Sequence, residues 1–256
     1  MKTIKEIAAA FKVAETYETW MDDFQFDERN AVQKAIASFQ KRMEKLEQVQ
    51  KAHDEKLAFD ASFLLNNHVY LAGTDEAGRG PLAGPVVTAA VILPNNCQAL
   101  LGINDSKQLT KDKRNEYAKR IKEHALAYSI HFQSPEEIDR LNILEATRQS
   151  MEMSINTLSI QPDVVIADAM KLNVSVQQHS IIKGDAKSLA IAAASILAKT
   201  ARDEYMDQLD EQFPMYGFKQ HAGYGTKQHL EALEKYGVTI HHRKSFEPIK
   251  SMCQKE

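Results

Sequence analysis

The stretch TDEAGRGP, residues 74–81, places two adjacent carboxylates, Asp75 and Glu76, at the end of a short apolar run. That run, residues 69–75 (VYLAGTD), predicts a β-strand. Neighbouring side chains on a regular strand point to opposite faces, so both carboxylates serve one site only where the chain turns. The glycines at positions 78 and 80 permit such a turn. Taken alone, the stretch is equally compatible with an ordinary charged turn.

Two further acidic residues follow or precede predicted elements in the same way. Asp168 is the last residue of the apolar run DVVIAD, and Asp185 follows Lys183-Gly184 immediately before an alanine-rich helical stretch. Each has a plain structural interpretation, because Asp168 could cap a turn and Asp185 could cap a helix. However, the carboxyl ends of strands are also where open α/β sheets bind their ligands.

The four carboxylates acquire a chemical meaning if they converge. Asp75, Glu76, Asp168 and Asp185 would repel one another strongly unless a cation neutralised them. Sets of oxygen ligands without Cys or His favour Mg²⁺ or Mn²⁺ over zinc. A pair of such ions is a common device for cleaving phosphodiesters in line. The sequence therefore predicts a two-metal site made of these four residues.

The remaining periodicities predict a mixed α/β sheet with helices on its faces. Strands are expected at residues 69–75, 85–93, 125–133, 163–168 and 175–182, and helices at 110–124, 135–158 (in two parts) and 185–212. The first 72 residues contain neither Gly nor Pro, and apolar spacing predicts helices at 3–12 and 27–50. We expect a small all-helical N-terminal domain, residues 1–66, and a catalytic domain, residues 67–256.

Composition excludes several classes of protein. The 256 residues carry a net charge of −3, so the chain is not a globally basic nucleic-acid binder. There is no apolar run long enough to span a membrane and no secretory signal. Cys97 and Cys253 are far apart, which argues against a disulfide framework and a zinc site. These features predict a soluble cytoplasmic protein.

Several motifs together resemble a known family. In order along the chain they are Asp75–Val86 (DEAGRGPLAGPV), Asp105-Ser106-Lys107, Asp168-Ala169, Lys183-Gly184-Asp185, Ala193–Lys199 (AASILAK) and Gly223-Tyr224-Gly225-Thr226. Over about residues 69–248 the chain is similar to type 2 ribonuclease H, the bacterial ribonuclease HII. Gly78-Arg79-Gly80 favours this type over ribonuclease HIII, which usually lacks it.

The resemblance implies an RNase H-like fold and a metal-dependent endonuclease. Its expected substrates are the RNA strand of RNA–DNA hybrids and DNA duplexes with embedded ribonucleotides, and its expected products carry 5′-phosphate and 3′-hydroxyl ends. The four family carboxylates correspond to Asp75, Glu76, Asp168 and Asp185. No membrane and no required protein partner are implied.

Substrate recognition needs other residues, and we expect Gly78, Arg79, Gly80, Lys107 and Tyr224 to provide it. The two glycines let the backbone approach a ribose or phosphate, and Arg79 could contact the same group. Tyr224 is similar to the family tyrosine that packs on the sugar beside the cleaved junction, although from sequence it could equally be a partly buried aromatic in a glycine turn. Lys107 opens a basic run that could touch the DNA backbone or form a solvated helix face; its members are Lys107, Lys111, Lys113, Arg114, Lys119 and Arg120. Residues 241–244 (HHRK) could add positive charge.

Two rival functions remain open at this stage. One is another two-metal nuclease of the same fold, of the resolvase or integrase type, and Gly78-Arg79-Gly80 together with Tyr224 argues against it. The other is a non-catalytic module that binds hybrids, and the presence of all four carboxylates argues against that.

Overall fold

The computed structural model describes residues 3–64, 69–103, 106 and 109–254. It contains two compact units, Met1–Asp54 and Glu55–Glu256, which divide within one long helix. Within the described residues, no helix is both long and apolar enough to cross a membrane.

The first unit is helical, as predicted. It contains α1 (Ile4–Val13), the short 3-10 helix η1 (Thr19–Phe24) and the first part of α2 (Asn30–Ala61). Thr3 begins α1 with a capping box, in which its hydroxyl accepts from the backbone of Glu6 and the Glu6 carboxylate accepts from the backbone of Thr3. The buried core of this unit consists of Ile7, Phe11, Ala14, Met21, Val32 and Phe39. The second helix continues to residue 61, well beyond the predicted end at residue 50, because no Gly or Pro interrupts it.

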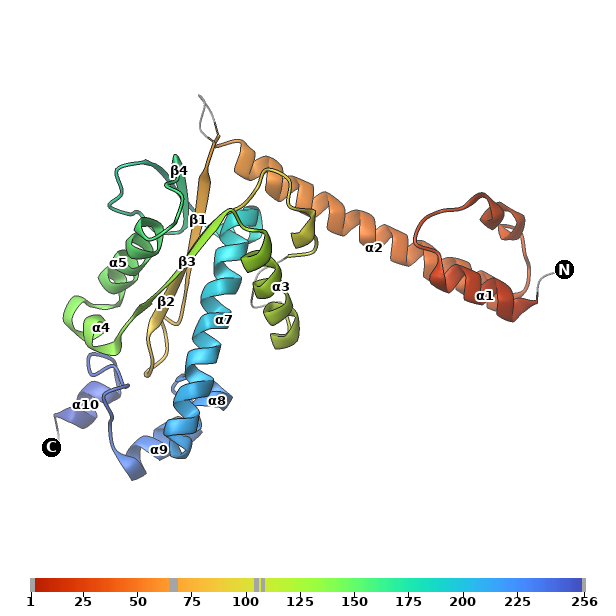
Figure 1. Cartoon of the computed structure of the whole chain (residues 1–256). Coiled ribbons are helices and arrows are strands. Elements are labelled where there is room, and N and C mark those ends of the chain that lie inside the picture. The colour runs from red at the N-terminus through yellow and green to blue at the C-terminus, as the bar shows by residue number, and fades with distance from the viewer. Residues whose placement is uncertain (1–2, 65–68, 104–105, 107–108, 255–256) are drawn as a thin grey trace. The chain divides into compact units, whose positions relative to one another are not determined.

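The second unit contains a five-stranded sheet and most of the helices (Figure 1). Its strands are β1 (Leu71–Ala77), β2 (Val86–Ile92), β3 (Ala127–Gln133), β4 (Val164–Asp168) and β5 (Gln177–Ile181). Its helices are η2 (Gln98–Leu100), α3 (Lys111–His124), α4 (Pro135–Leu141), α5 (Ile143–Asn156), α6 (Gly184–Lys187), α7 (Leu189–Gln212), η4 (Pro214–Tyr216), α8 (Phe218–His221), α9 (Lys227–Tyr236) and α10 (Ile249–Cys253).

The strand order confirms the predicted mixed sheet. It is β3-β2-β1-β4-β5, in which β1, β2 and β3 pair antiparallel while β1, β4 and β5 pair parallel. Strand β1 is therefore central, with an antiparallel neighbour on one side and a parallel neighbour on the other. The side chains of β1 therefore lie between those of β2 and those of β4.

Helices cover both faces of the sheet, as Figure 1 shows for α7 and α5. The alternation along β2 separates the two cores, because successive side chains of a strand point to opposite faces. Ala89 and Val91 pack in the cluster that contains the alanine-rich start of α7. Ala90 and Ile92 pack in the cluster that contains Met151 of α5. The sheet is thus buried on both sides.

Gly73 allows α7 to approach β1 unusually closely. A Cβ built on Gly73 would lie 2.4 Å from the carbonyl carbon of Ala190 and 2.4 Å from the nitrogen of Ile191. Both atoms belong to the backbone of α7, so no side-chain rotation could relieve the clash. The N-terminal end of α7 is therefore held against the centre of β1.

Replacing Gly73 by alanine is expected to destabilise the second unit strongly. The added methyl group must displace α7, and overpacking of a well-packed core costs about 1–3 kcal/mol. We expect the loss to reach the upper end of this range because the clash is with backbone. Thermal unfolding measured with Gly80→Ala as the control checks this, since a Cβ on Gly80 meets only Tyr224, at 3.5 Å. Equal melting temperatures for the two variants would contradict it.

Candidate active site

The β1–β4 pairing brings two of the predicted carboxylates to one edge of the sheet. The last parallel pair is Thr74 with Ala167, so Asp75 and Asp168 are the next residues on adjacent strands. Strand β1 does not end at Asp75, as the sequence suggested, but continues to Ala77 through its pairing with β2. The antiparallel partner thus extends the strand past the point where its parallel partner stops.

Neighbouring carboxylates at this edge help to raise the pKa values of Asp75 and Glu76. Burial raises the pKa of Asp75 well above its usual value, and the charges of Glu76 and Asp168 raise it further. Burial also raises the pKa of Glu76, where Asp168 adds to the effect and Arg79 opposes it. Asp75 is only 5% exposed. Asp75 and Glu76 are therefore poorly solvated neighbours of Asp168, whose charge disfavours the charged form of both.

Asp185 lies in a separate turn of helix rather than at the start of a long one. The sequence predicted one helix over residues 185–212, but the chain is extended at Ser188, with φ −110° and ψ 136°. The Ser188 hydroxyl accepts from the backbone of Ile191 and so begins α7 anew. The preceding turn, α6, is tied to β4 because the backbone nitrogen of Gly184 donates to Asp168 at 2.7 Å.

The residue types at this edge fit a divalent cation, although their side chains engage protein partners. Within the described ranges, no three acidic, His or Cys residues form a ready-made metal site. Asp75 accepts from the Glu76 backbone at 2.7 Å, and Glu76 pairs with Arg79 at 3.4 Å. The donor set contains only oxygen atoms, and its mutual repulsion would be relieved by a cation. Reorienting these side chains would free their oxygens for such an ion.

The loop after the carboxylates is held by a buried arginine that sequence reasoning interpreted differently. Arg243, one of the residues expected to add positive charge, is fully buried. Its guanidinium donates to the carbonyls of Gly78, at 2.6 Å, Arg79, at 2.9 Å, and Gly84, at 3.0 Å. The buried guanidinium of Arg243 therefore fixes the backbone of the Gly-Arg-Gly loop.

A second buried arginine holds the other side of this loop. Arg202 of α7 donates to the carbonyls of Ala83, Pro85 and Ala222, at 3.0–3.1 Å. Gly78 has φ +94°, and a Cβ there would lie 2.0 Å from Nε of Arg202. Position 78 therefore needs glycine for reasons of backbone conformation and packing, independent of any substrate.

Sequence spacing contained a signal for one of these arginines. Arg202 precedes Met206 and Leu209 by four and seven residues, so the three share one helix face, and all are buried. An arginine within an apolar stripe indicates a buried, hydrogen-bonded guanidinium. Arg243 had no comparable signal, because its contacts depend on how distant loops meet.

The structure brings Tyr224 beside the Gly-Arg-Gly loop, because a Cβ built on Gly80 would lie 3.5 Å from its ring. The nitrogen of Leu82 donates to the carbonyl of Gly223 at 2.8 Å, which joins the two loops. Tyr224 is 49% exposed, which is more than expected of a buried aromatic in a turn. The side chain of Arg79 is also exposed, and it contacts Glu76. Gly80, Arg79 and Tyr224 therefore present one open surface.

Two neutral histidines, His242 and His229, form a chain of hydrogen bonds that ends at the backbone carbonyl of Tyr224. The backbone nitrogen of Thr239 donates to Nδ1 of His242, so Nε2 of His242 carries the hydrogen and donates to Nε2 of His229, 3.1 Å away. Nδ1 of His229 then donates to the carbonyl of Tyr224 at 3.0 Å. Burial lowers the pKa of both histidines to about 4. His242 therefore adds no positive charge, contrary to the interpretation of residues 241–244.

The predicted basic run is largely neutralised. Lys107, the member that the prediction singled out, lies outside the described residues. Four other members pair with carboxylates: Lys111 with Asp207, Arg114 with Asp203, Lys119 with Glu123, and Arg120 with Glu116. This helix face is thus closer to the solvated alternative than to a purely basic surface.

Comparison with known proteins identifies the class. A sequence model of ribonuclease HII matches residues 72–249, and one of the ribonuclease HII N-terminal domain matches residues 3–64. The ribonuclease HII of Enterococcus faecalis is 48% identical over 252 residues, which cover 98% of each chain. That of Halalkalibacterium halodurans is 47% identical over 249 residues, covering 96% of this chain and 94% of the relative.

Solved structures agree with the sequence relatives. The ribonuclease H2 from Pyrococcus horikoshii superposes with a TM-score of 0.65 at 26% identity, covering 73% of this chain and 98% of that one. The fold and the family matches thus define a ribonuclease H, an endonuclease that acts on RNA–DNA hybrids. More specifically, the chain belongs to the ribonuclease HII family.

The histidine chain predicts loss of stability in mild acid. The folded pKa values of His229 and His242 lie near 4, below the unfolded value near 6.5. Between these pH values the unfolded state binds more protons, so their contribution is complete above pH 6.5 and is lost as pH falls toward 4. We expect a loss of about 1–2 kcal/mol from each histidine at pH 5.

The measurement is the fall in melting temperature between pH 7 and pH 5. Because buried carboxylates with raised pKa oppose this trend, the comparison is made between wild type and His242→Asn, whose side chain does not titrate. The variant should show a smaller fall than wild type, whereas replacement of the exposed His124 by Asn should not change it. An equal pH dependence in His242→Asn would contradict the neutral chain.

Proposed function

We propose that Asp75, Glu76, Asp168 and Asp185 together bind two divalent cations, Mg²⁺ or Mn²⁺, and that the chain hydrolyses phosphodiesters there. The observation that carries this proposal is the β1–β4 register, because it puts Asp75 and Asp168 side by side at the carboxyl edge of the sheet. Ligand sites of α/β sheets lie at such edges. The raised pKa values of Asp75 and Glu76 support the same view.

The chain's own residues prepare the reaction. When bound, divalent cations lower the pKa of water and neutralise the phosphoryl oxygens of the scissile group. Asp75 accepts from the backbone nitrogen of Glu76, and Asp168 accepts from the backbone nitrogen of Gly184, so both carboxylates have a fixed partner. Water attacks the phosphorus and the P–O3′ bond breaks, so the leaving oxygen takes up a proton as a 3′-hydroxyl and the phosphate remains as a 5′-phosphate.

We further propose that the exposed surface of Gly80, Arg79 and Tyr224 reads the sugar next to the scissile bond. The 2′-hydroxyl is the group that distinguishes RNA from DNA at a single nucleotide. Gly80 offers its backbone without a Cβ, and Tyr224 offers a flat face. This arrangement suits a single ribonucleotide within a DNA duplex as well as a continuous hybrid. Gly78 supports the same loop, and Lys107 remains a predicted backbone contact.

The division of labour along the chain is also proposed. Residues 1–66 act as an accessory domain, while residues 67–256 contain the four carboxylates and the proposed substrate-binding residues. Two free cysteines, Cys97 and Cys253, are compatible with a reducing, cytoplasmic setting.

The direct test is cleavage of three labelled duplexes, with and without Mn²⁺. They are an RNA–DNA hybrid, a DNA duplex with one ribonucleotide, and an all-DNA duplex. We expect metal-dependent cleavage of the first two only, with a 3′ end that a polymerase can extend. Cleavage of the all-DNA duplex would favour a resolvase-like nuclease, and 3′-phosphate ends would contradict the proposed hydrolysis.

Asp75→Asn is expected to abolish cleavage without weakening the fold. The amide oxygen can still accept from the Glu76 backbone, while one of the repelling charges is removed. The melting temperature in EDTA should therefore equal or exceed that of wild type. Asp23→Asn, at an exposed position in the first unit, provides the control. Melting of Asp75→Asn well below wild type in EDTA would show that Asp75 is mainly structural.

Tyr224→Ala should weaken cleavage most on a single embedded ribonucleotide, where deoxyribose follows. Packing on an aromatic face is worth roughly 1–3 kcal/mol, so a ten- to hundredfold loss in kcat/KM is expected there. The loss on a long hybrid should be smaller. Tyr128→Ala, at a similarly exposed tyrosine of β3, is the matched control. An unchanged ratio of kcat/KM on the two substrates would remove Tyr224 from this role.

A further inference from the structure

The end of α2 belongs to the same compact unit as the sheet, because that unit begins at Glu55. Lys56 and Asp60 are four residues apart and so lie on one face of this helix. Lys56 is only 7% exposed, which is unusual for lysine unless its ammonium group is engaged. These two residues contact the segment that carries Asp185.

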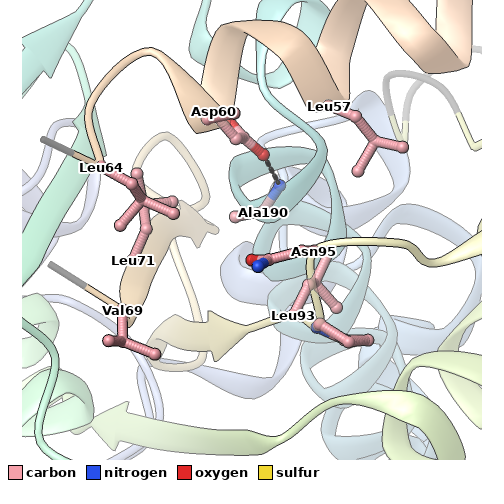
Figure 2. A pocket seen from close by; sticks show the side chains of 10 residues that line it. Leu57, Asp60, Leu64, Val69, Leu71, Leu93, Asn95 and Ala190 are labelled. Carbon is pink, nitrogen blue, oxygen red and sulfur yellow. Dashed lines mark hydrogen bonds between the residues drawn. The ribbon is translucent and has the colours of Figure 1, made fainter. Parts of the chain in front are cut away.

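Asp60 binds the first amides of α7. Its Oδ2 accepts from the backbone nitrogens of Leu189 and Ala190, both at 3.0 Å, and Figure 2 shows the contact with Ala190. The first amides of a helix lack partners within the helix, and the positive end of its dipole favours an acidic group. Ser188 satisfies only the next amide, that of Ile191. Asp60 therefore completes a cap that the local sequence leaves unfinished.

Lys56 binds the turn that precedes α7. Its ammonium group donates to the backbone carbonyl of Asp185 at 3.0 Å. The segment 184–190 is thus held at three places: by Asp168 at its start, by Lys56 at Asp185, and by Asp60 at its end. Two of these three anchors come from α2.

Packing beside these contacts is incomplete. A cavity of about 420 Å³ opens between the end of α2 and the sheet, lined by Leu57, Asp60, Leu64, Leu71 and Asn95 among others (Figure 2). Apolar side chains therefore fill only part of this junction. The polar contacts of Lys56 and Asp60 consequently carry more of the positioning than they would in a close-packed core.

We propose that Lys56 and Asp60 are positioning residues for the catalytic carboxylate Asp185. They act through the backbone of residues 184–190. The last turns of α2 thus help to complete the active site. The inference rests on the proposed metal-binding role of Asp185. Catalytic groups must be held to within a fraction of an ångström, so loosening this segment should reduce turnover rather than substrate binding.

The experiment uses full-length variants: Asp60→Ala, Asp60→Asn, Lys56→Met and, as control, Glu55→Ala at an exposed position of the same helix. We would measure kcat and KM on an RNA–DNA hybrid, Mn²⁺ affinity by calorimetry, and amide hydrogen exchange of residues 184–191. Asp60→Ala should lower kcat at least tenfold with KM within twofold, weaken Mn²⁺ binding, and speed exchange. Asp60→Asn should recover most of the loss, because its amide oxygen can accept from both nitrogens, and Lys56→Met should be intermediate.

Two results would overturn the inference. One is a lower melting temperature of Asp60→Ala with unchanged kcat, Mn²⁺ affinity and exchange. The other is equal impairment of Asp60→Asn and Asp60→Ala. Failure of the wild type to bind Mn²⁺ or to cleave the hybrid would instead refute the proposed function. The exchange measurement is independent of catalysis and would still report whether Asp60 holds the segment.

Discussion

The close contact between β1 and α7 at Gly73 is the constraint on which the rest of the second unit depends. Backbone meets backbone there, at a distance that leaves no room for a Cβ. Once this crossing is fixed, α7 carries Arg202 to the carbonyls of Ala83 and Pro85, which follow the Gly-Arg-Gly loop. Helix α7 has 24 residues and rises about 1.5 Å per residue. This one helix thus links the carboxylates to the surface of Gly80, Arg79 and Tyr224.

The same constraint explains why the start of α7 is capped from outside. An alanine-rich helix can approach a sheet closely, but its first amides then become buried and need acceptors. Ser188 supplies one locally, and Asp60 supplies the others from a helix more than a hundred residues earlier in the chain. Close packing at one end of α7 therefore requires a polar anchor at its N-terminus. Asp60 of α2 meets this requirement, and α2 is thereby joined to the segment that carries Asp185.

Sequence patterns predicted the parts that depend on local periodicity. The mixed sheet and the helices expected at residues 110–124 and 135–158 follow from apolar spacing. The break at Ser188 was missed because its neighbours are good helix formers, and the extension of β1 past Asp75 depends on pairing with β2. Lys56, Asp60, Arg202 and Arg243 act through contacts between distant segments, which no short pattern encodes.

The two buried arginines have carbonyl partners rather than carboxylates, and this choice has an electrostatic consequence. Burial lowers the pKa of Arg202 to about 10 and that of Arg243 to about 9, so both remain charged at neutral pH. Three carbonyl bonds each offset the cost of removing these charges from water. Nearby carboxylates compensate these charges in part, since Asp203 acts on Arg202 and Asp139 acts on Arg243. The carbonyls of Gly78 and Arg79 are therefore held by a cationic donor, Arg243, in a chain whose net charge is −3.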